Sequence, residues 1–243
     1  MAPFLHTHPY EPFLFKEATK LIVGTLPPPR FTIGDLKEGD VDFCYGSRDG
    51  QLWPILDEIF KLNLKFETTE EAAQQRIDFL RQRKIGICDI VASAERTKID
   101  ASDVGMENIQ LRNLLGYLRE YPNVNTLLFT GGNSKNGPEY FFRRHLKENG
   151  LRLRLLSNEV PRIHEFDLPI TNALDIAISR GRQPLVSAKT EISTRQIKTV
   201  SLIAPSGAAN RAVGSLQAYK EMKKQHPELN TIDFRVLQYK AFF

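Results

Sequence analysis

Short apolar runs, separated by longer stretches in which apolar residues recur at helical spacing, make up most of the chain. A short apolar run bounded by turn residues predicts a buried strand. The first run is followed at once by Pro27, Pro28 and Pro29, which cannot easily continue a strand or begin a helix. Strands are predicted at LIVG (21–24), TLLFTGG (126–132), LRLRLL (151–156), TVSLIA (199–204) and DFRVLQY (233–239).

The stretches between these runs predict helices. Thr69 precedes a cluster of acids and is a candidate N-cap, and another stretch has Pro138 near its start and Gly150 at its end. Strands that alternate with helices predict an α/β protein whose mostly parallel sheet is covered on both faces. The helices are expected at 53–63, 69–83, 106–122, 137–150 and 207–227.

The chain is interpreted as a single domain over residues 1–243, because 243 residues, 41% of them hydrophobic, can bury a sizeable core. Residues 1–12 are expected to form a loosely held N-terminal arm. Residues 158–198 are mostly polar and are interpreted as an extended connection, with a short helical piece near 172–179. A connection of that length is often functional.

Composition narrows the function classes only modestly. Cys44 and Cys88 are the only cysteines, too few for a disulfide framework or a four-ligand metal site, so a reduced, cytoplasmic protein is expected. The start of the chain does not have the pattern of a signal peptide, and no apolar run approaches the ~18 residues of a membrane span. His6 and His8 resemble a metal pair only superficially, and no metal is expected. The charge of +4 and the isoelectric point of about 9 suit a nucleic-acid partner.

Three loops that follow predicted strands are rich in glycine, proline, serine and asparagine: GTLPPPRF, GGNSKNG and APSGAANR. Ligands of open parallel sheets bind outside the carboxyl ends of the strands, so one site built from these loops is expected. In the last loop Ser206 and the backbone N–H groups that follow it could hold an anion, with Arg211 nearby, or Ser206 could simply cap a helix. In the second loop Lys135 could touch phosphate, or the loop could be an ordinary turn.

Two further segments carry candidate binding residues. In FCYGSRDGQLW (43–53) aromatic rings flank a polar turn that contains Arg48, an arrangement that could sandwich a nucleobase. The alternative is a β-turn with Trp53 in the core, and Tyr45 is the better stacking candidate. Asp89 lies in the apolar stretch GICDI, where a carboxylate is costly to bury without a partner, so it caps a turn or accepts hydrogen bonds from a ligand.

Taken together, these segments resemble the uracil-DNA glycosylase superfamily, and among its members the hypoxanthine-DNA glycosylase branch. The resemblance covers roughly residues 14–240. Its motifs, in order, are GTLP (24–27), YGSRDGQLW (45–53), DIVAS (89–93) followed by Asp100 and Ser102, FTGGNS (129–134), and PSGAAN (205–210).

The resemblance implies a three-layer αβα sandwich around a central four-stranded parallel sheet. It also implies excision of a damaged base, flipped out of DNA, without a metal or cofactor. The proline-rich loop would be a rigid wall of the base pocket, and Asp89 would read the base edge. Implied substrate-binding residues are Gly24, Thr25, Pro27, Phe43, Tyr45, Asp89 and Asn133, and implied DNA-binding residues are Pro205, Ser206, Gly207, Ala208, Ala209, Asn210 and Arg211.

Two positions depart from the family pattern. Many relatives have Asp or Asn immediately before the loop proline, where this chain has Leu26. The hypoxanthine branch has its key asparagine at a position that is Gly50 here. Asp49 is therefore the predicted catalytic residue, which would orient water and offset positive charge on the sugar, and Asp40 and Asp42 are further candidates.

The sequence thus predicts a monofunctional DNA glycosylase, a hydrolase of base excision repair that acts on uracil, hypoxanthine or a related deaminated base. A monomer that binds damaged or mismatched duplex DNA, and possibly single strands, with no membrane partner, is expected. A second hypothesis is a DNA-binding or lesion-sensing module that kept the fold and lost the hydrolytic group. A third is an α/β hydrolase of free nucleosides or another small glycoside, which would use the same pocket without base flipping and against which the proline–serine loop argues.

Overall fold

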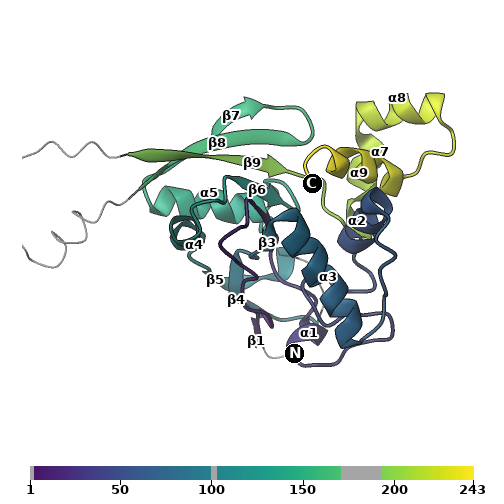
Figure 1. The fold of residues 1–243 in the computed structure, drawn as a ribbon, viewed down its shortest axis with the longest axis horizontal. Coiled ribbons are helices and arrows are strands. Elements are labelled where there is room, and N and C mark those ends of the chain that lie inside the picture. Colours follow the sequence, from purple (N-terminus) through teal and green to yellow (C-terminus); the bar gives the residue numbers. More distant parts are fainter. Residues whose placement is uncertain (1–2, 100–102, 171–192) are drawn as a thin grey trace, which may run out of the picture.

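The computed structural model describes residues 3–99, 103–170 and 193–243, which form a mixed α/β protein (Figure 1). Its main sheet has six strands in the order β3-β2-β6-β9-β8-β7. The first four of these are mutually parallel, and β8 and β7 continue the sheet in antiparallel fashion. The bounds are β2 Lys20–Val23, β3 Ile85–Ile87, β6 Thr126–Phe129, β7 Arg154–Ser157, β8 Arg162–Pro169 and β9 Thr194–Ser201. The sheet is therefore larger than the predicted four-stranded parallel sheet.

Alternation along the parallel strands divides the core into two halves. Leu21 and Val23 of β2 pack on one face with residues of α4 (Leu114–Glu120) and α5 (Pro138–Glu148). Ile22 packs on the other face with residues of α2 (Leu52–Phe60), α3 (Glu70–Arg83) and α9 (Thr231–Lys240). Helices thus cover both faces of the sheet, as the alternation of elements predicts.

A second, three-stranded antiparallel sheet was not predicted. It has the order β1-β4-β5, with β1 Phe4–Thr7, β4 Val91–Arg96 and β5 Glu107–Leu111. The pairing of β1 with β4 ties down residues 4–7, which differs from the loosely held arm expected for residues 1–12. The prediction of a helix over 106–122 is wrong for its first part, because Glu107–Leu111 form β5 and pair with β4. The helix begins only after Asn113, whose side chain caps α4.

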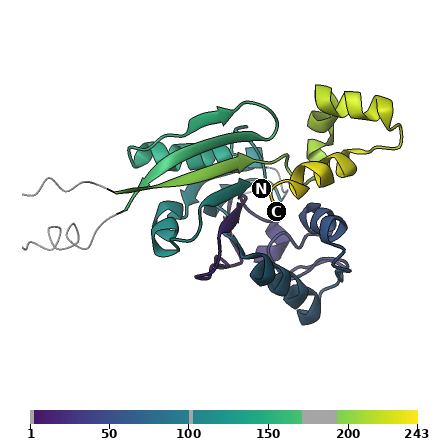
Figure 2. The ribbon, with the colours of Figure 1, turned by 45° about the horizontal axis from the view of Figure 1, so that its top comes forward.

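The C-terminal region also differs from expectation. The run DFRVLQY (233–239) is helix rather than strand, because Asn230 and Asp233 form a capping box that begins α9. The helix expected at 207–227 consists of a short 3₁₀ turn, η2 (Gly207–Ala209), then α7 (Asn210–Ser215) and α8 (Gln217–Gln225). Extended backbone at Leu216 separates α7 from α8. In Figure 2 these yellow helices stand beyond the end of β9.

Three of the predicted helices agree with the structure. The helices expected at 53–63, 69–83 and 137–150 are α2, α3 and α5, and Thr69 caps α3 through its side chain. The proline run was not expected to begin a helix, yet a four-residue helix, α1 (Pro29–Thr32), starts at Pro29, because proline is tolerated in the first turn of a helix. A 3₁₀ turn, η1, spans Asp103–Gly105. The connection 158–198 contains β8 and part of β9, and its expected helical piece at 172–179 lies outside the described residues. Within the described ranges, no helix is both long and apolar enough to cross a membrane.

Candidate functional site

A cavity of about 690 Å³ lies where the parallel strands end. Its walls come from the loops after β2, β3, β6 and β9, together with the segment 45–52 that leads into α2. This is the edge at which ligands of parallel sheets bind, and the volume lies within the range of small-molecule sites. The lining residues are Thr25, Leu26, Pro27, Pro28, Arg30, Tyr45, Gly46, Ser47, Asp49, Gly50, Gln51, Leu52, Asp89, Asp103, Thr130, Pro205, Ser206, Gly207 and Ala208. We call it the main cavity.

Backbone hydrogen bonds join two of the predicted loops across the main cavity. The N–H of Gln51 donates to the carbonyl oxygen of Pro205 at 2.9 Å. Gly50 and Ser206 form an antiparallel bridge beside this bond. The proline–serine loop is therefore fixed to the segment that carries Tyr45, although the two are far apart in the sequence.

The carboxylate of Asp89 connects the loops on the floor of the main cavity. Its Oδ1 accepts hydrogen bonds from the backbone N–H of Gly24 and from the Tyr45 hydroxyl, both at 2.7 Å. Its Oδ2 lies 3.0 Å from Nε2 of His8. Because Nδ1 of His8 accepts a hydrogen bond from the backbone N–H of Tyr10, the ring hydrogen lies on Nε2 and is donated to Asp89. With three donors in place, Asp89 acts first as a structural centre.

Gly24 shows how closely these groups approach one another. A Cβ at this position would lie 2.2 Å from the Tyr45 hydroxyl oxygen and 2.8 Å from Oδ1 of Asp89. Only glycine leaves room for the hydroxyl to reach the carboxylate. Tyr45 itself has a φ of 58°, a left-handed conformation that is unfavourable for an aromatic residue and turns its side chain toward Asp89. Burial raises the pKa of Tyr45 well above its usual value, so its hydroxyl remains a donor.

Arg30, at the start of α1, links the proline-rich loop to the turn before α2. Its guanidinium donates to both oxygens of Asp40, at 2.7 and 2.8 Å, and to the hydroxyl of Ser47 at 2.8 Å. Asp40 is fully buried and also accepts from the backbone N–H groups of Lys37 and Arg48. Burial raises the pKa of Asp40, but these hydrogen bonds outweigh burial and bring it down to about 2. Asp40 is thus part of the framework of the site.

Asp49 is placed differently from Asp40. Its side chain is 74% exposed, lines the main cavity and lies 3.4 Å from Nη2 of Arg30. Asp42, the other candidate, accepts a hydrogen bond from the Tyr10 hydroxyl and does not line the main cavity.

Asp103 is a second carboxylate of the main cavity, and the sequence did not single it out. Its Oδ1 accepts a hydrogen bond from the Thr25 hydroxyl at 2.7 Å. Burial raises its pKa to about 6; the Thr25 hydrogen bond and the charge of Arg96 oppose this rise, and the charge of Asp89 adds to it. A carboxylate with this pKa is mostly ionised at neutral pH and readily accepts a proton.

A second cavity of about 350 Å³ adjoins the first and shares Asp103 and Thr130 with it. Its other walls include Gly131, Gly132 and residues of α7. The turn 204–209 lines both cavities.

The predicted site residues divide into two groups. The predicted residues that line the main cavity are Thr25, Pro27, Tyr45, Asp49, Asp89 and the segment 205–208. Gly24 does not line it, but its backbone N–H donates to Asp89, which does. Apart from Gly24, five predicted residues do not line it, and one of these, Ala209, lines the second cavity instead. Phe43 packs against Phe13 and Trp53; Asn133 is exposed in the loop after β6; the Asn210 side chain bonds to Thr231 and Arg235; and Arg211 is exposed on α7.

The geometry does not support the alternative interpretation of Ser206 as an ordinary helix cap. Ser206 stands at the N-cap position of η2, but its side chain makes no capping hydrogen bond within the described residues. Trp53 is fully buried and its indole N–H donates to the Cys44 carbonyl, as expected of a core residue.

Three functional candidates escaped the sequence reasoning. His8 was considered only as a metal ligand, whereas it contacts Asp89. Asp103 follows Asp100 and Ser102, which carried the motif and lie outside the described residues. Gln51 lines the main cavity, and no distinct sequence signal marks it. No group of three or more potential metal ligands occurs in ranges 3–99, 103–170 and 193–243. Comparisons with known protein families, curated proteins and solved structures find no match for this chain.

Proposed function

We propose that the chain is a monofunctional DNA glycosylase that hydrolyses the N-glycosidic bond of a deaminated base extruded from DNA. The observation that supports this most strongly is the meeting of Pro27, Tyr45, Asp89 and Ser206 around one cavity. These residues come from four separate segments that the family resemblance assigns to base excision. The proposal includes the three-layer αβα sandwich of that family, with β7 and β8 as an extension of its four parallel strands.

The main cavity supplies groups suited to this chemistry. Extrusion of a base costs a few kcal/mol and is easiest at a mismatch or lesion. The prolines of the loop after β2 fix its backbone, so little ordering entropy is lost on binding. The ring of Tyr45 lines the cavity with its hydroxyl fixed by Asp89, so it is positioned to stack on the base.

Two carboxylates have different roles in the hydrolytic step of this proposal. The water oxygen bonds to C1′ of the sugar, and the glycosidic bond breaks with its electron pair on the departing base. One water proton goes to Asp103, whose pKa of about 6 suits a general base, and the anionic base takes a proton from solvent. Asp49, which lines the main cavity beside Arg30, offsets the positive charge that develops on the sugar.

The loop after β9 would contact the DNA. Gly207 and Ala208 are exposed at the main cavity and can enter the base stack, while the Ser206 hydroxyl, which makes no capping bond in the described structure, can donate to a phosphate. Arg211 on α7 is exposed one helix turn further on. Phosphate contacts of this kind make binding sensitive to salt.

A second candidate function, a lesion-sensing module without catalysis, is favoured by one observation. Leu26 is a buried core residue at the position where many relatives have Asp or Asn, and Gly50 has no side chain. Neither can activate water. This candidate therefore requires that Asp49 and Asp103 do not replace those groups.

The proposal is tested with labelled duplexes that carry uracil, hypoxanthine or xanthine opposite each normal base, treated with alkali after incubation to cleave abasic sites. We expect cleavage of at least one duplex, lost by 100-fold or more in Asp103→Asn and reduced in Asp49→Ala. Asp35→Asn, a change of an exposed aspartate that does not line the main cavity, is the matched control.

Other outcomes would contradict the proposal. Salt-sensitive binding of lesion-bearing DNA without cleavage would favour the lesion-sensing module. Activity on free nucleosides alone would favour the nucleoside hydrolase.

A further inference from the structure

The loop after β9 is held from behind by one face of α9. Arg235, Gln238 and Tyr239 lie three and four residues apart, so their side chains share a face of this helix. The side-chain oxygen of Gln238 accepts from the backbone N–H of Ile203 at 2.9 Å, and the Tyr239 hydroxyl donates to the Ile203 carbonyl oxygen at 2.7 Å. Both polar groups of the Ile203 backbone are thus bonded to α9, which fixes the start of the loop.

Arg235 fixes the part of this loop that follows. Its Nη2 donates to the carbonyl oxygen of Ser206 at 3.1 Å, and its Nη1 donates to Oδ1 of Asn210 at 3.0 Å. The Thr231 hydroxyl, one turn earlier on α9, donates to the same Asn210 oxygen at 3.0 Å. A planar guanidinium can bind two such acceptors at once, so Arg235 ties both ends of the turn 206–210 to one helix.

The guanidinium of Arg235 is unusual in its surroundings. The residue is fully buried, yet its hydrogen-bond partners in the described structure are carbonyl and amide oxygens rather than a carboxylate. Its Nε is buried without a partner among the described residues. A buried charge with neutral partners costs stability, and an apolar side chain would fill the same space at a lower cost. Packing alone therefore does not explain an arginine at this position.

The turn that Arg235 holds has little support at its tip. Gly207 and Ala208 are exposed there, and a Cβ added to Gly207 would meet no atom within 4 Å. Within the turn, the N–H of Ala209 donates to the same Ser206 carbonyl oxygen that accepts from Arg235. The shape of the exposed tip therefore depends on how its two ends are held.

We propose that Arg235 is a positioning residue that keeps the turn 206–210 in the shape in which it replaces an extruded base in the DNA stack. The proposal rests on the proposed function and adds the group that holds the inserted turn. A turn that is already rigid loses little ordering entropy when it enters the duplex. Arg235 lines neither cavity and acts through Ser206 and Asn210, so it takes no part in the chemical step.

The test compares single-turnover excision of one lesion, uracil or hypoxanthine, in two duplexes. In one duplex the lesion faces a normal base, and in the other it faces an abasic-site analogue. The unpaired lesion is extruded more easily, so its excision depends less on the inserted turn. The variants are Arg235→Met, which removes the guanidinium, and Arg235→Lys, which keeps a charge but not the planar fork.

Arg195→Met is the matched control. Arg195 also donates to backbone carbonyl oxygens, among them those of Leu118 and Val124, and it lines neither cavity. Its loss should therefore lower the stability of the protein without affecting the turn 206–210.

In Arg235→Met we expect excision of the paired lesion to slow about 10- to 100-fold, the range that loss of one hydrogen bond from a charged group produces. Excision of the unpaired lesion should slow much less, so the ratio of the two rates falls. Arg235→Lys should give an intermediate ratio, and Arg195→Met should keep the ratio of the wild type. Hydrogen exchange over residues 206–210 should be faster in Arg235→Met than in the wild type, because the turn opens more readily.

The ratio separates positioning from a merely structural role, because a variant that folds poorly loses activity on both duplexes by the same factor. An unchanged ratio in Arg235→Met, with the lesion still excised by the wild type, would overturn the role of Arg235 and leave the proposed function standing. If Arg235→Met does not fold, the ratio in Arg235→Lys decides in the same way. Failure of the wild type to excise either lesion would overturn the proposed function and this role together.

Discussion

Two pairs of aspartates in and around the main cavity differ in how their carboxylates are used. Asp40 and Asp89 are 0% and 6% exposed, and each accepts hydrogen bonds from donors on three separate residues. Asp49 and Asp103 line the cavity with fewer constraints: Asp49 is 74% exposed beside Arg30, and Asp103 accepts from Thr25 and borders both cavities. The first pair holds the loops in place, and the second pair is available to a ligand.

The comparison teaches that burial of a carboxylate is not by itself a sign of function. A buried carboxylate with enough donors stabilises the fold, and its removal leaves those donors without a partner. A carboxylate whose pKa is raised by burial costs stability in its ionised form, and such a cost is typical of groups that do chemistry. Asp103 should therefore respond to mutation in the opposite direction from Asp40 and Asp89.

The largest effect is expected for Asp89→Asn. The amide group would face Nε2–H of His8, so a donor would meet a donor in a buried place. We expect a loss of roughly 3–5 kcal/mol in the free energy of unfolding, measured by urea denaturation at pH 7. The control variant, Asp35→Asn, should leave the free energy of unfolding unchanged. A loss below about 1 kcal/mol would show that Asp89 does not hold the loops together.

Asp103→Asn should have the opposite effect. The pKa of Asp103 is about 6 in the folded protein against an ordinary value of 3.8, so the folded state holds this proton more tightly than the unfolded state. As pH rises from about 4 to about 6, the wild type loses stability from this group, up to about 3 kcal/mol, and above that the loss is complete. The variant should therefore become more stable than the wild type over this range.

The measurement for Asp103 is the difference in unfolding free energy between variant and wild type, taken at intervals from pH 4 to 8. Groups that titrate in both proteins cancel in the difference. A difference that does not change with pH would contradict the raised pKa and weaken the role of Asp103 as a base.

The smallest effect on stability is expected for Ser206→Ala. Because the Ser206 side chain makes no capping bond in the described structure, we expect a change below about 0.5 kcal/mol. Thr69→Ala, which removes a true cap from α3, should cost about 1 kcal/mol. Affinity for a lesion-bearing duplex should fall about fivefold in Ser206→Ala and not in Thr69→Ala. Equal affinities would exclude Ser206 from the DNA contact.

Much of the parallel sheet could be predicted from local pattern. The strands at 21–24 and 126–132 are continuous apolar runs, which is what a strand buried on both faces requires. The run DFRVLQY also predicts a strand, although polar residues interrupt it, and its conformation is decided by the capping box at its start. The strands β4, β5 and β8 carry charged residues and form only through pairing with distant partners, so pattern alone could not reveal them.

The part of the candidate site that depends on strand order could be predicted from the sequence. Loops that follow parallel strands meet at one edge whatever their sequence, and this brought Pro27, Tyr45 and Ser206 together. Asp103 could not be found in the same way. Its significance comes from its burial and from the groups around it, which depend on the assembled loops.

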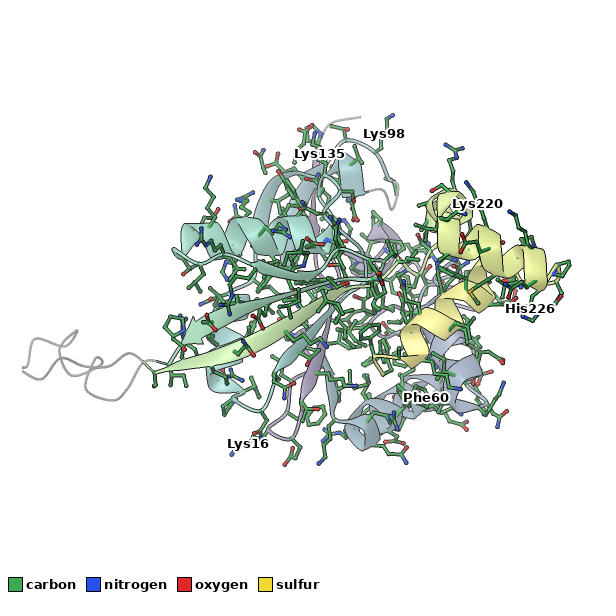
Figure 3. All side chains as sticks on the ribbon, turned by 90° about the horizontal axis from the view of Figure 1, so that it is seen from above. Lys16, Phe60, Lys98, Lys135, Lys220 and His226 are labelled. Carbon is green, nitrogen blue, oxygen red and sulfur yellow. The ribbon has the colours of Figure 1, made fainter. Side chains whose placement is uncertain are left out.

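Figure 3 shows that charged side chains extend from many sides of the molecule, with Lys220 and Lys16 widely separated in this view. Lys220 lies on α8, close in sequence to the loop after β9, whereas Lys16 precedes β2. Basic side chains are therefore spread over the surface, and the position of bound DNA is tested directly at the main cavity.

The most direct test is a structure of the protein bound to a duplex with one lesion nucleotide whose 2′-fluorinated sugar resists cleavage. The account predicts that the extruded base occupies the main cavity between Pro27, Tyr45 and Gln51, with the turn 205–208 inserted into the duplex. A duplex bound over another face, such as the β7–β8 hairpin, with the main cavity unoccupied, would contradict it.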